Sequence, residues 1–423
     1  MSTNAEIIAV GNEVLLSNYR QAPVVLDHGK GCELWDVEGR RFLDLYGGIA
    51  VSALGHAHPA LVEAIQAQAH KLLHASNLVW NEPAVVLARH LVDLTRPEGG
   101  GAPALSRVFL CNSGTEAMEA CVKLARRHAF LRGEPQRTRF VAFKNSFHGR
   151  SLGALPLTGT PKYWEGFGCD LERVTHLDFG QLDQVRAYLE AHPREVCGIV
   201  AEPVQGEGGV LPAPEGFLRG LRALADEFGA LLILDEIQTG IGRTGAWFAW
   251  QHAGVVPDVM PLAKGLGGGV PIGAMLVRES LNGVLSPGTH GTTFGGNPLA
   301  AAAAVAVLET MQKDELVDRA AKMGAYLSAK LAEVARQHPA IFAGERGLGL
   351  LRGLLMARGV EARQLLAAAR DHGVLLSVAS ERVLRVTPPL VVDDATIDEA
   401  ARAIGAAAAS IPSPAARDTK PSV

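Results

Sequence analysis

"ALLILDEIQTGIGRTG", residues 230–245, places a short apolar run directly before a carboxylate, Asp235. A nearly continuous apolar run of this length is typical of a strand buried on both faces of a parallel sheet. Three similar runs occur upstream: "RVFLC" (107–111), "RFVAF" (139–143) and "GIVAE" (198–202). Helix-like segments alternate with these runs. The alternation predicts an α/β fold with a mostly parallel sheet flanked by helices.

The rest of the chain predicts further units. Residues 1–65 hold "GKGCELWDVEGRRFLDLYGG", which favours two short strands joined at the turn-like "VEGR". We expect residues 66–310 to form the large domain and residues 311–410 to form a smaller α+β domain. The tail, 411–423, is rich in proline and serine, and we expect it to be disordered.

Composition excludes several classes of function. The formal net charge of −4 over 423 residues gives no reason to expect nucleic acid or an anionic membrane as a partner. The five cysteines are scattered, with no C-x-x-C pair, which favours a reduced cytoplasmic chain over a disulfide framework or a zinc site. The start, "MSTNAEIIAV", lacks the features of a signal peptide. The apolar run 299–308 is far shorter than the roughly 20 residues of a membrane span.

Chemistry-bearing residues follow the apolar runs. Glu202 and Asp235 end two of them, and "RVFLCNSGT" leads into a helix that begins near Gly114 and Thr115. Ligands of open α/β sheets collect at the carboxyl ends of the strands, and N–H groups at a helix start can bind an anion. On these residues alone two alternatives stay open. "NSGTEA" could be an ordinary helix cap, and Asp235 could belong to a structural ion pair.

An isolated lysine is a candidate nucleophile. In "MPLAKGLGGG" (260–269), Lys264 lies between apolar residues and glycines, where desolvation would favour its neutral amine over a simple surface charge. An anion site, a strand-terminal carboxylate, an isolated lysine and several arginines together indicate an enzyme that uses pyridoxal 5′-phosphate. The helix start would hold the phosphate and Asp235 would keep the pyridine nitrogen protonated. Lys264 would bind the cofactor and then transfer a proton.

Two other motifs give weaker signals. "GIGRTG" (240–245) matches the dinucleotide pattern G-x-G-x-x-G, but "EIQT" separates it from the strand and "AWFAWQ" is a poor helix start. A nicotinamide-dependent oxidoreductase is therefore an alternative with little support. His56 and His58 in "GHAHP" come with no set of carboxylates or cysteines, so we predict no metal site there.

Eight motifs occur in order along the chain: "GGIAVSALGHAHP", "SNLVWNEP", "NSGTEAMEA", "FHGRSLGAL", "EPVQGEGG", "LDEIQTGIGRTG", "AKGLGGGVPIGAM" and "HGTTFGGNPLA". With them the chain resembles the class III, ornithine-type pyridoxal-phosphate aminotransferases from about residue 20 to about residue 405. The resemblance implies a fold-type I enzyme whose small domain is built from both chain ends, including residues 1–65. It also implies an obligate homodimer with active sites at the interface.

The resemblance assigns cofactor roles residue by residue. In "FHGR", Phe147 would stack on the pyridine ring and Arg150 would grip a substrate carboxylate. In "DEIQ", Asp235 would pair with the ring nitrogen, Ile237 would pack on the other ring face, and Gln238 would bond near the ring hydroxyl. Each has a structural alternative, such as core packing for the phenylalanine or a surface ion pair for the arginine.

The remaining assignments concern substrate and partner subunit. Lys264 would carry the covalent link, and Thr293 in "GTTFGG" would reach the other subunit's phosphate, unless it caps the helix beginning near Pro298. Thr292 would touch substrate. Glu202 and Arg385 match the family's switch pair, which would separate when glutamate brings its own carboxylate. Both could instead be structural.

The resemblance also implies a substrate. The expected reaction is reversible transfer of the δ-amino group of N2-acetylornithine to 2-oxoglutarate, as in arginine biosynthesis. Members acting on free ornithine carry a tyrosine where this chain has Ile49, which favours an acylated amine. Succinylornithine in arginine breakdown, 4-aminobutyrate and ornithine remain alternatives. A non-catalytic pyridoxal-phosphate regulator is disfavoured, because no DNA-binding segment or basic patch is evident.

Overall fold

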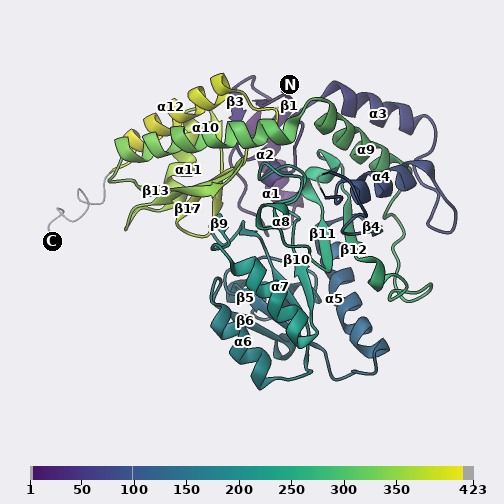
Figure 1. Ribbon diagram of the computed structural model, residues 1–423. Helices are drawn as coiled ribbons and strands as arrows, with labels where there is room; N and C mark the ends of the chain where they lie inside the picture. The colour runs from purple at the N-terminus through teal and green to yellow at the C-terminus, as the bar shows by residue number, and fades with distance from the viewer. Residues whose placement is uncertain (1–2, 98, 413–423) are drawn as a thin grey trace.

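The computed structural model describes residues 3–97 and 99–412. Its largest sheet has seven strands in the order β4-β12-β11-β10-β7-β5-β6 (Figure 1). Neighbouring strands are parallel except at β12, which runs antiparallel to both β11 and β4. The strands are β4 (Arg107–Cys111), β5 (Arg139–Phe143), β6 (Val174–Leu177), β7 (Val196–Ala201), β10 (Leu231–Leu234), β11 (Val259–Leu262) and β12 (Gly273–Val277). The predicted mostly parallel sheet is confirmed.

Helices cover both faces of this sheet, which explains why its strands are continuously apolar. Leu231 and Ile233 of β10 pack in the cluster that contains α5 (Gly114–Leu131). Leu232 and Leu234 pack in the cluster that contains α6 (Leu182–Ala191) and α7 (Phe217–Phe228). Because successive side chains point to opposite faces, a strand buried on both sides must be apolar at every position.

Two four-stranded sheets accompany the large one. The first, β1-β2-β3-β15, joins strands from both ends of the chain, because β15 pairs in parallel with β3. The expected pair of strands flanking "VEGR" is confirmed as the antiparallel pair β2 and β3. The second sheet, β13-β14-β17-β16, comes from the C-terminal part. The strands are β1 (Leu26–Lys30), β2 (Glu33–Asp36), β3 (Arg41–Asp44), β13 (Phe342–Leu348), β14 (Leu351–Met356), β15 (Val374–Leu375), β16 (Ser377–Ala379) and β17 (Val383–Val386).

The C-terminal helices lie over the second small sheet, where α10 and α12 run side by side (Figure 1). On the other side of the molecule α3 and α4 pack against α9. The remaining α-helices are α1 (Asn4–Val14), α2 (Gly47–Ala50), α3 (Pro59–Ala69), α4 (Glu82–Asp93), α8 (Trp250–Ala253), α9 (Pro298–Lys313), α10 (Leu316–Gln337), α11 (Ala362–Asp371) and α12 (Asp394–Ser410). Short elements are β8 (Val204–Gln205), β9 (Leu211–Pro212), η1 (Leu155–Leu157), η2 (Pro161–Tyr163), η3 (Leu171–Arg173), η4 (Lys264–Gly267) and η5 (Glu279–Leu281).

Most of the tail expected to be disordered, residues 413–423, lies outside the described residues. Within the described part of the chain no helix is long and apolar enough to cross a membrane. The domain boundaries at 65, 310 and 410 stay a prediction, although the pairing of β3 with β15 brings the two chain ends into one sheet.

Candidate active site

A cavity of about 450 Å³ opens where strands of the large sheet end. Most of the predicted site residues line it: Gly114, Thr115, Phe147, Arg150, Glu202, Asp235, Ile237, Gln238 and Lys264. They come from different strands, since β7 leads into Glu202, β10 into Asp235 and β11 into the turn that carries Lys264. The polar residues that follow these separate strands therefore lie together in one cavity, as expected for an open α/β sheet.

The N-terminus of α5 forms an anion site on one wall of the cavity. Ser113 caps the helix and its Oγ accepts the N–H of Glu116 at 3.3 Å. Among the described residues no group accepts a hydrogen bond from the N–H of Gly114 or Thr115. A Cβ on Gly114 would lie 2.9 Å from Cδ1 of Ile237, so only glycine fits between the helix and this side chain. The first turn thus keeps two donors free for a phosphate.

Thr115 also fastens the next loop to α5. Its Oγ1 accepts the N–H groups of Arg150 and Ser151, both at 3.3 Å, and lies 2.9 Å from Ser151 Oγ. Gly149 has φ +127°, and a Cβ there would lie 2.4 Å from Thr115 Oγ1. The glycine of "FHGR" therefore permits the close approach that seats Phe147 and Arg150 at the cavity.

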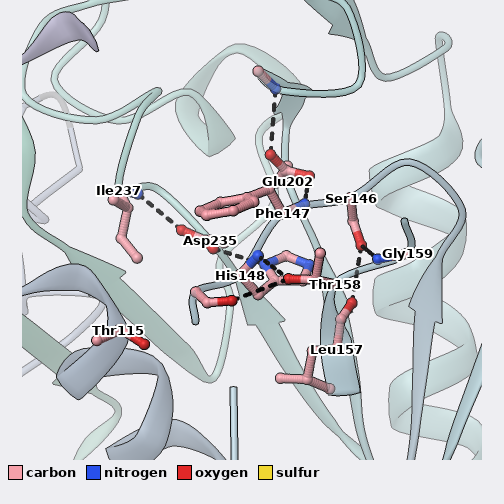
Figure 2. A network of polar contacts seen from close by, with 12 residues as sticks. Thr115, Ser146, Phe147, His148, Leu157, Thr158, Gly159, Glu202, Asp235 and Ile237 are labelled. Atoms are coloured by element: carbon pink, nitrogen blue, oxygen red, sulfur yellow. Dashed lines mark hydrogen bonds and ion pairs between the residues drawn. The ribbon is translucent and has the colours of Figure 1, made fainter. Parts of the chain in front are cut away.

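Asp235 is held by a histidine that the sequence analysis did not single out. Asp235 Oδ2 lies 2.7 Å from His148 Nδ1, and Oδ1 accepts the N–H of Ile237 at 3.0 Å (Figure 2). Burial disfavours a charged imidazole, but the hydrogen bond and charge of Asp235 outweigh burial and raise the pKa of His148. Its place directly after Phe147 in the motif is the only sequence signal that could have identified it. The pair fixes a buried carboxylate in one orientation.

Lys264 begins the turn η4 in a strained conformation, with φ +46°. A non-glycine residue in the left-handed region is uncommon and persists only where its surroundings enforce it. Burial lowers the pKa of the Lys264 amine to about 8, although the nearby charge of Glu207 opposes this shift. The neutral amine that a nucleophile requires is therefore far more populated near neutral pH than in an exposed lysine.

Aromatic rings support the arginine at the cavity. The Arg150 guanidinium lies 5.5 Å from the centre of the Phe147 ring and 4.0 Å from that of Tyr163. The two rings meet edge to face, with centres 6.0 Å apart. No acidic side chain of the described residues lies within ion-pair distance of Arg150, whose side chain is exposed. The group can therefore receive a carboxylate from solution. The role of Tyr163 was not predicted.

The predicted pair of Glu202 with Arg385 is wrong. Arg385, which is 1% exposed on β17, forms its ion pair with Glu207. It also donates to Oε1 of Gln238 at 3.3 Å and to Oγ of Ser377 at 3.1 Å. Glu202 cannot serve because it follows β7 directly and its carboxyl accepts two backbone N–H groups, those of Phe147 and Gly206, each at 3.3 Å. Glu207 lies in the turn between β8 and β9 and reaches the arginine.

The two glutamates of "EPVQGEGG" have opposite protonation tendencies. Burial raises the pKa of Glu202 to about 8, with His148 opposing and Asp235 reinforcing the shift. Burial also acts on Glu207, but the charge of Arg385 outweighs it and lowers the pKa of that carboxyl. Near neutral pH Glu207 is therefore a carboxylate, whereas Glu202 is largely a neutral acid.

The two predicted threonines lie outside the main cavity of this chain. Thr292 Oγ1 accepts hydrogen bonds from Asn112 Nδ2 and the N–H of Gly295, both at 3.2 Å. Thr293 is exposed and borders a separate small hollow. The alternative that Thr293 caps α9 is wrong, because Asn297 is the cap and its side chain accepts the N–H of Ala300 at 2.9 Å. A role of Thr293 toward a second subunit stays a prediction.

"GIGRTG" forms a series of turns, and α8 begins only at Trp250. Arg243 within it is buried and donates to the carbonyl oxygens of Leu350 and Pro388. The stretch therefore ties the loop after β10 to the C-terminal part of the chain, which is not the strand-loop-helix arrangement of a dinucleotide site. Across residues 3–97 and 99–412 no group of three or more His, Cys, Asp or Glu could hold a metal ion.

Comparisons with known proteins agree over nearly the whole chain. The sequence model of the aminotransferase class-III family matches residues 15–408. A Pseudomonas aeruginosa protein named succinylornithine transaminase/acetylornithine aminotransferase is 46% identical over 388 residues, which cover 91% of this chain and 92% of that protein. The acetylornithine aminotransferase of Myxococcus xanthus is 44% identical over 398 residues, 94% of this chain and 96% of that one.

A solved structure extends the likeness to three dimensions. The ornithine aminotransferase of Toxoplasma gondii, whose crystals show partial occupancy of PLP at the active site, superposes with a TM-score of 0.90. It is 32% identical in sequence, and the alignment covers 96% of this chain and 95% of that chain. The fold of the two proteins is therefore shared along nearly their full length.

Proposed function

The chain belongs to the class-III aminotransferases, and from this premise we propose that its amino donor is N2-acetylornithine and its acceptor 2-oxoglutarate. The products would be N-acetylglutamate 5-semialdehyde and glutamate, a step of arginine biosynthesis. One observation carries the proposal: a single cavity combines Lys264, the His148–Asp235 pair and the unpaired N–H groups at the N-terminus of α5. The names of the Pseudomonas and Myxococcus relatives support the donor.

The enzyme is a pyridoxal-phosphate-dependent aminotransferase, and the residues of the cavity fit this cofactor. The bound cofactor supplies an electron sink for the carbon from which the amino group is transferred. The N–H groups of Gly114 and Thr115 would hold its phosphate, and Gly114 is a residue where a Cβ would collide with Ile237. Asp235, oriented by His148, would hold the proton on the pyridine nitrogen. Phe147 and Ile237 would pack against the two faces of the ring, and Gln238 would bond near its hydroxyl.

Lys264 would have two successive tasks. Its neutral amine, favoured by burial, would hold the cofactor covalently through the aldehyde group of the cofactor. Once released by the amino donor, the same Nζ would take up the proton that leaves the substrate carbon bearing the amino group, and would give a proton back on the other side of the transferred nitrogen. A pKa of about 8 suits both tasks, because Nζ must accept and release a proton near neutral pH.

Two different donors must use this one cavity. Acetylornithine presents an apolar chain beside its reacting amine, so a bare Arg385 would be a buried cation with no partner. Glu207 supplies that partner. When glutamate or 2-oxoglutarate enters, its α-carboxylate would replace Glu207 as the bidentate partner of Arg385, while Arg150 holds the distal carboxylate. The switch therefore uses Glu207, not Glu202.

A homodimer is part of the proposal. Residues 74–77 border the same small hollow as Thr293. Large apolar side chains on both sides of them in the chain, and one next to Thr293, are exposed: Leu72, Leu73, Leu78, Val79, Trp80 and Phe294. Trp80 is 93% exposed and Leu78 is 94% exposed, which is unusual for large apolar groups on a monomer. The ring of Phe294 lies 5.4 Å from that of His74, so the two segments form one surface. Its burial against a second copy would bring Thr293 toward the partner's cavity.

Thr293→Ala tests this arrangement. We expect cofactor affinity to fall about tenfold to a hundredfold, because a hydrogen bond to a charged phosphate contributes about 1.5–3 kcal/mol. Titration of the apoenzyme with pyridoxal phosphate measures the affinity. Thr289→Ala is the matched control, since its hydroxyl donates to Ser286 O within the same loop. A fully active monomer in sedimentation would contradict the proposal, as would equal loss in both variants.

The donor is tested by steady-state kinetics with 2-oxoglutarate as acceptor. Acetylornithine, succinylornithine, ornithine and 4-aminobutyrate form the panel, and we expect the acylated ornithines to have the highest kcat/KM. Succinylornithine is the second candidate, favoured by the name of the Pseudomonas aeruginosa relative. A preference for free ornithine or 4-aminobutyrate would contradict the assignment. A cytoplasmic location stays a prediction.

A further inference from the structure

The segment Gly47–Ala50 forms a left-handed turn. Its four residues have φ values of 54°, 61°, 67° and 62°, and the backbone returns to right-handed values at Val51. Glycine tolerates this conformation, but Ile49 and Ala50 do not, and for a β-branched residue it is an outlier. Such a turn persists only where neighbouring groups enforce it.

Asp44 binds the backbone where the turn begins. Its side chain is fully buried, and Oδ1 accepts the N–H of Tyr46 at 3.1 Å and of Gly47 at 2.8 Å. The second oxygen, Oδ2, lies 2.6 Å from Nε2 of His56. A single carboxylate therefore binds the N–H groups of the residue before the turn and of its first residue, and is itself held by an imidazole.

His56 is anchored independently of the turn. Its backbone exchanges two hydrogen bonds with Gly31, of 3.0 and 2.9 Å. Its side chain occupies the space above Gly29, where a Cβ would lie 2.8 Å from His56 Cβ. The imidazole thus braces Asp44 from a fixed position on the first small sheet.

The turn lies between the strand that carries Arg385 and the turn that carries Lys264. On one side Thr387, two residues beyond Arg385 on the chain, donates its N–H to Leu45 O at 2.7 Å and its hydroxyl to Tyr46 O at 2.9 Å. On the other side α2 packs against η4, the turn of Lys264. Val51, the first residue after the left-handed run, lines the cavity itself.

We propose that Asp44 and His56 are positioning residues that hold the turn Gly47–Ala50 in the form that accepts the amino donor. Neither side chain lines the cavity, so both act through the turn and through Val51. The inference rests on the proposed function, because it concerns the donor of that reaction. We call the Asp44–His56 pair the brace. Without it, the strained turn would relax toward ordinary backbone conformations, and only a fraction of the enzyme would present a site able to bind the amino donor.

His56→Ala is the first test, and His28→Ala is its matched control. His28 also pairs with an aspartate, Asp27, but on the surface, where the two side chains are 62% and 61% exposed. In His56→Ala we expect KM for acetylornithine to rise about tenfold with kcat within about twofold, because partial population of the competent form reduces apparent affinity. Amide hydrogens of residues 47–53 should exchange about tenfold faster in the free enzyme. The control should match wild type in both measurements.

A rescue experiment separates positioning from general stability. Ala50→Gly removes the steric penalty of the left-handed conformation without touching the brace. Combined with His56→Ala, it should restore most of the affinity and exchange protection. Ser52→Gly, just outside the left-handed run, adds backbone freedom without relieving that penalty and should restore neither. If His56→Ala does not fold, Asp44→Asn replaces it, because the amide retains an acceptor for the two N–H groups.

Unchanged exchange and unchanged KM in His56→Ala would overturn the inference. So would rescue by Ser52→Gly as effective as that by Ala50→Gly. A wild-type enzyme that transfers no amino group from any tested donor would instead refute the proposed function. The exchange measurement on the free enzyme would still report whether the brace holds the turn.

Discussion

Lys264→Ala is expected to lower turnover by about a thousandfold or more while the cofactor still binds, since general acid–base catalysis alone contributes about 10²–10⁴-fold. The phosphate site at α5 and the Asp235–His148 pair remain intact in this variant. The loss therefore concerns the proton transfer and the covalent attachment, not cofactor recruitment. Single-turnover measurement of each half-reaction separates these effects from substrate binding.

Chemical labelling supplies the control for Lys264. Borohydride should fix pyridoxal phosphate to the peptide that contains Lys264 in the wild type and should leave that peptide unlabelled in Lys264→Ala. Lys264→Arg keeps the positive charge but cannot provide a neutral amine near neutral pH, so it should be as inactive as the alanine variant. Attachment to a different lysine would show that the catalytic amine has been misassigned.

The lysine should also leave a signature in the stability of the apoenzyme. Its pKa is about 8 in the folded chain and 10.5 in the reference state, so between these values the unfolded chain binds more protons. Stability therefore rises with pH across that window, and the buried amine destabilises the fold below it. Lys264→Met should be more stable than wild type at pH 7, and its advantage should shrink toward pH 10. Urea midpoints at several pH values measure the difference, and parallel curves would contradict the buried position.

Much of this site could be predicted because the sequence places functional residues directly after buried strands. The apolar runs ending at Glu202 and Asp235, together with the run leading to Gly114, required no knowledge of distant contacts to be placed at one sheet edge. Lys264 follows the same rule after β11. The topology of parallel strands carries this information, since their carboxyl ends must meet.

Other features of the site depend on three-dimensional geometry that the spacing of residues in the sequence does not encode. "EPVQGEGG" offers two glutamates five residues apart, and only the turn between β8 and β9 determines that Glu207 rather than Glu202 reaches Arg385. His148 gave no separate signal because its role is to hold another side chain. The role predicted for Thr293 involves a second subunit, and spacing within the sequence does not encode how two copies pack.

The second large effect concerns the choice between donors, and the variant that reports it is Arg385→Lys. We expect the half-reaction with glutamate to slow by about tenfold or more, because the variant keeps the charge but loses a hydrogen bond to a charged group, which contributes about 1.5–3 kcal/mol. A lysine cannot reproduce the planar fork that grips an α-carboxylate. The half-reaction with acetylornithine should suffer less, since this donor places an apolar chain near the pair. Stopped-flow absorbance follows each half-reaction separately.

Glu207→Gln should produce the opposite pattern. It leaves Arg385 without its carboxylate, so the half-reaction with glutamate should be preserved or faster, and that with acetylornithine should weaken because a buried cation is left uncompensated. Glu202→Gln is the matched control from the same motif. Its carboxyl is largely neutral below its pKa of about 8, so an amide changes little charge at pH 7 and should affect both donors equally. A donor-specific effect in Glu202→Gln but not in Glu207→Gln would show that the switch in solution uses the other glutamate.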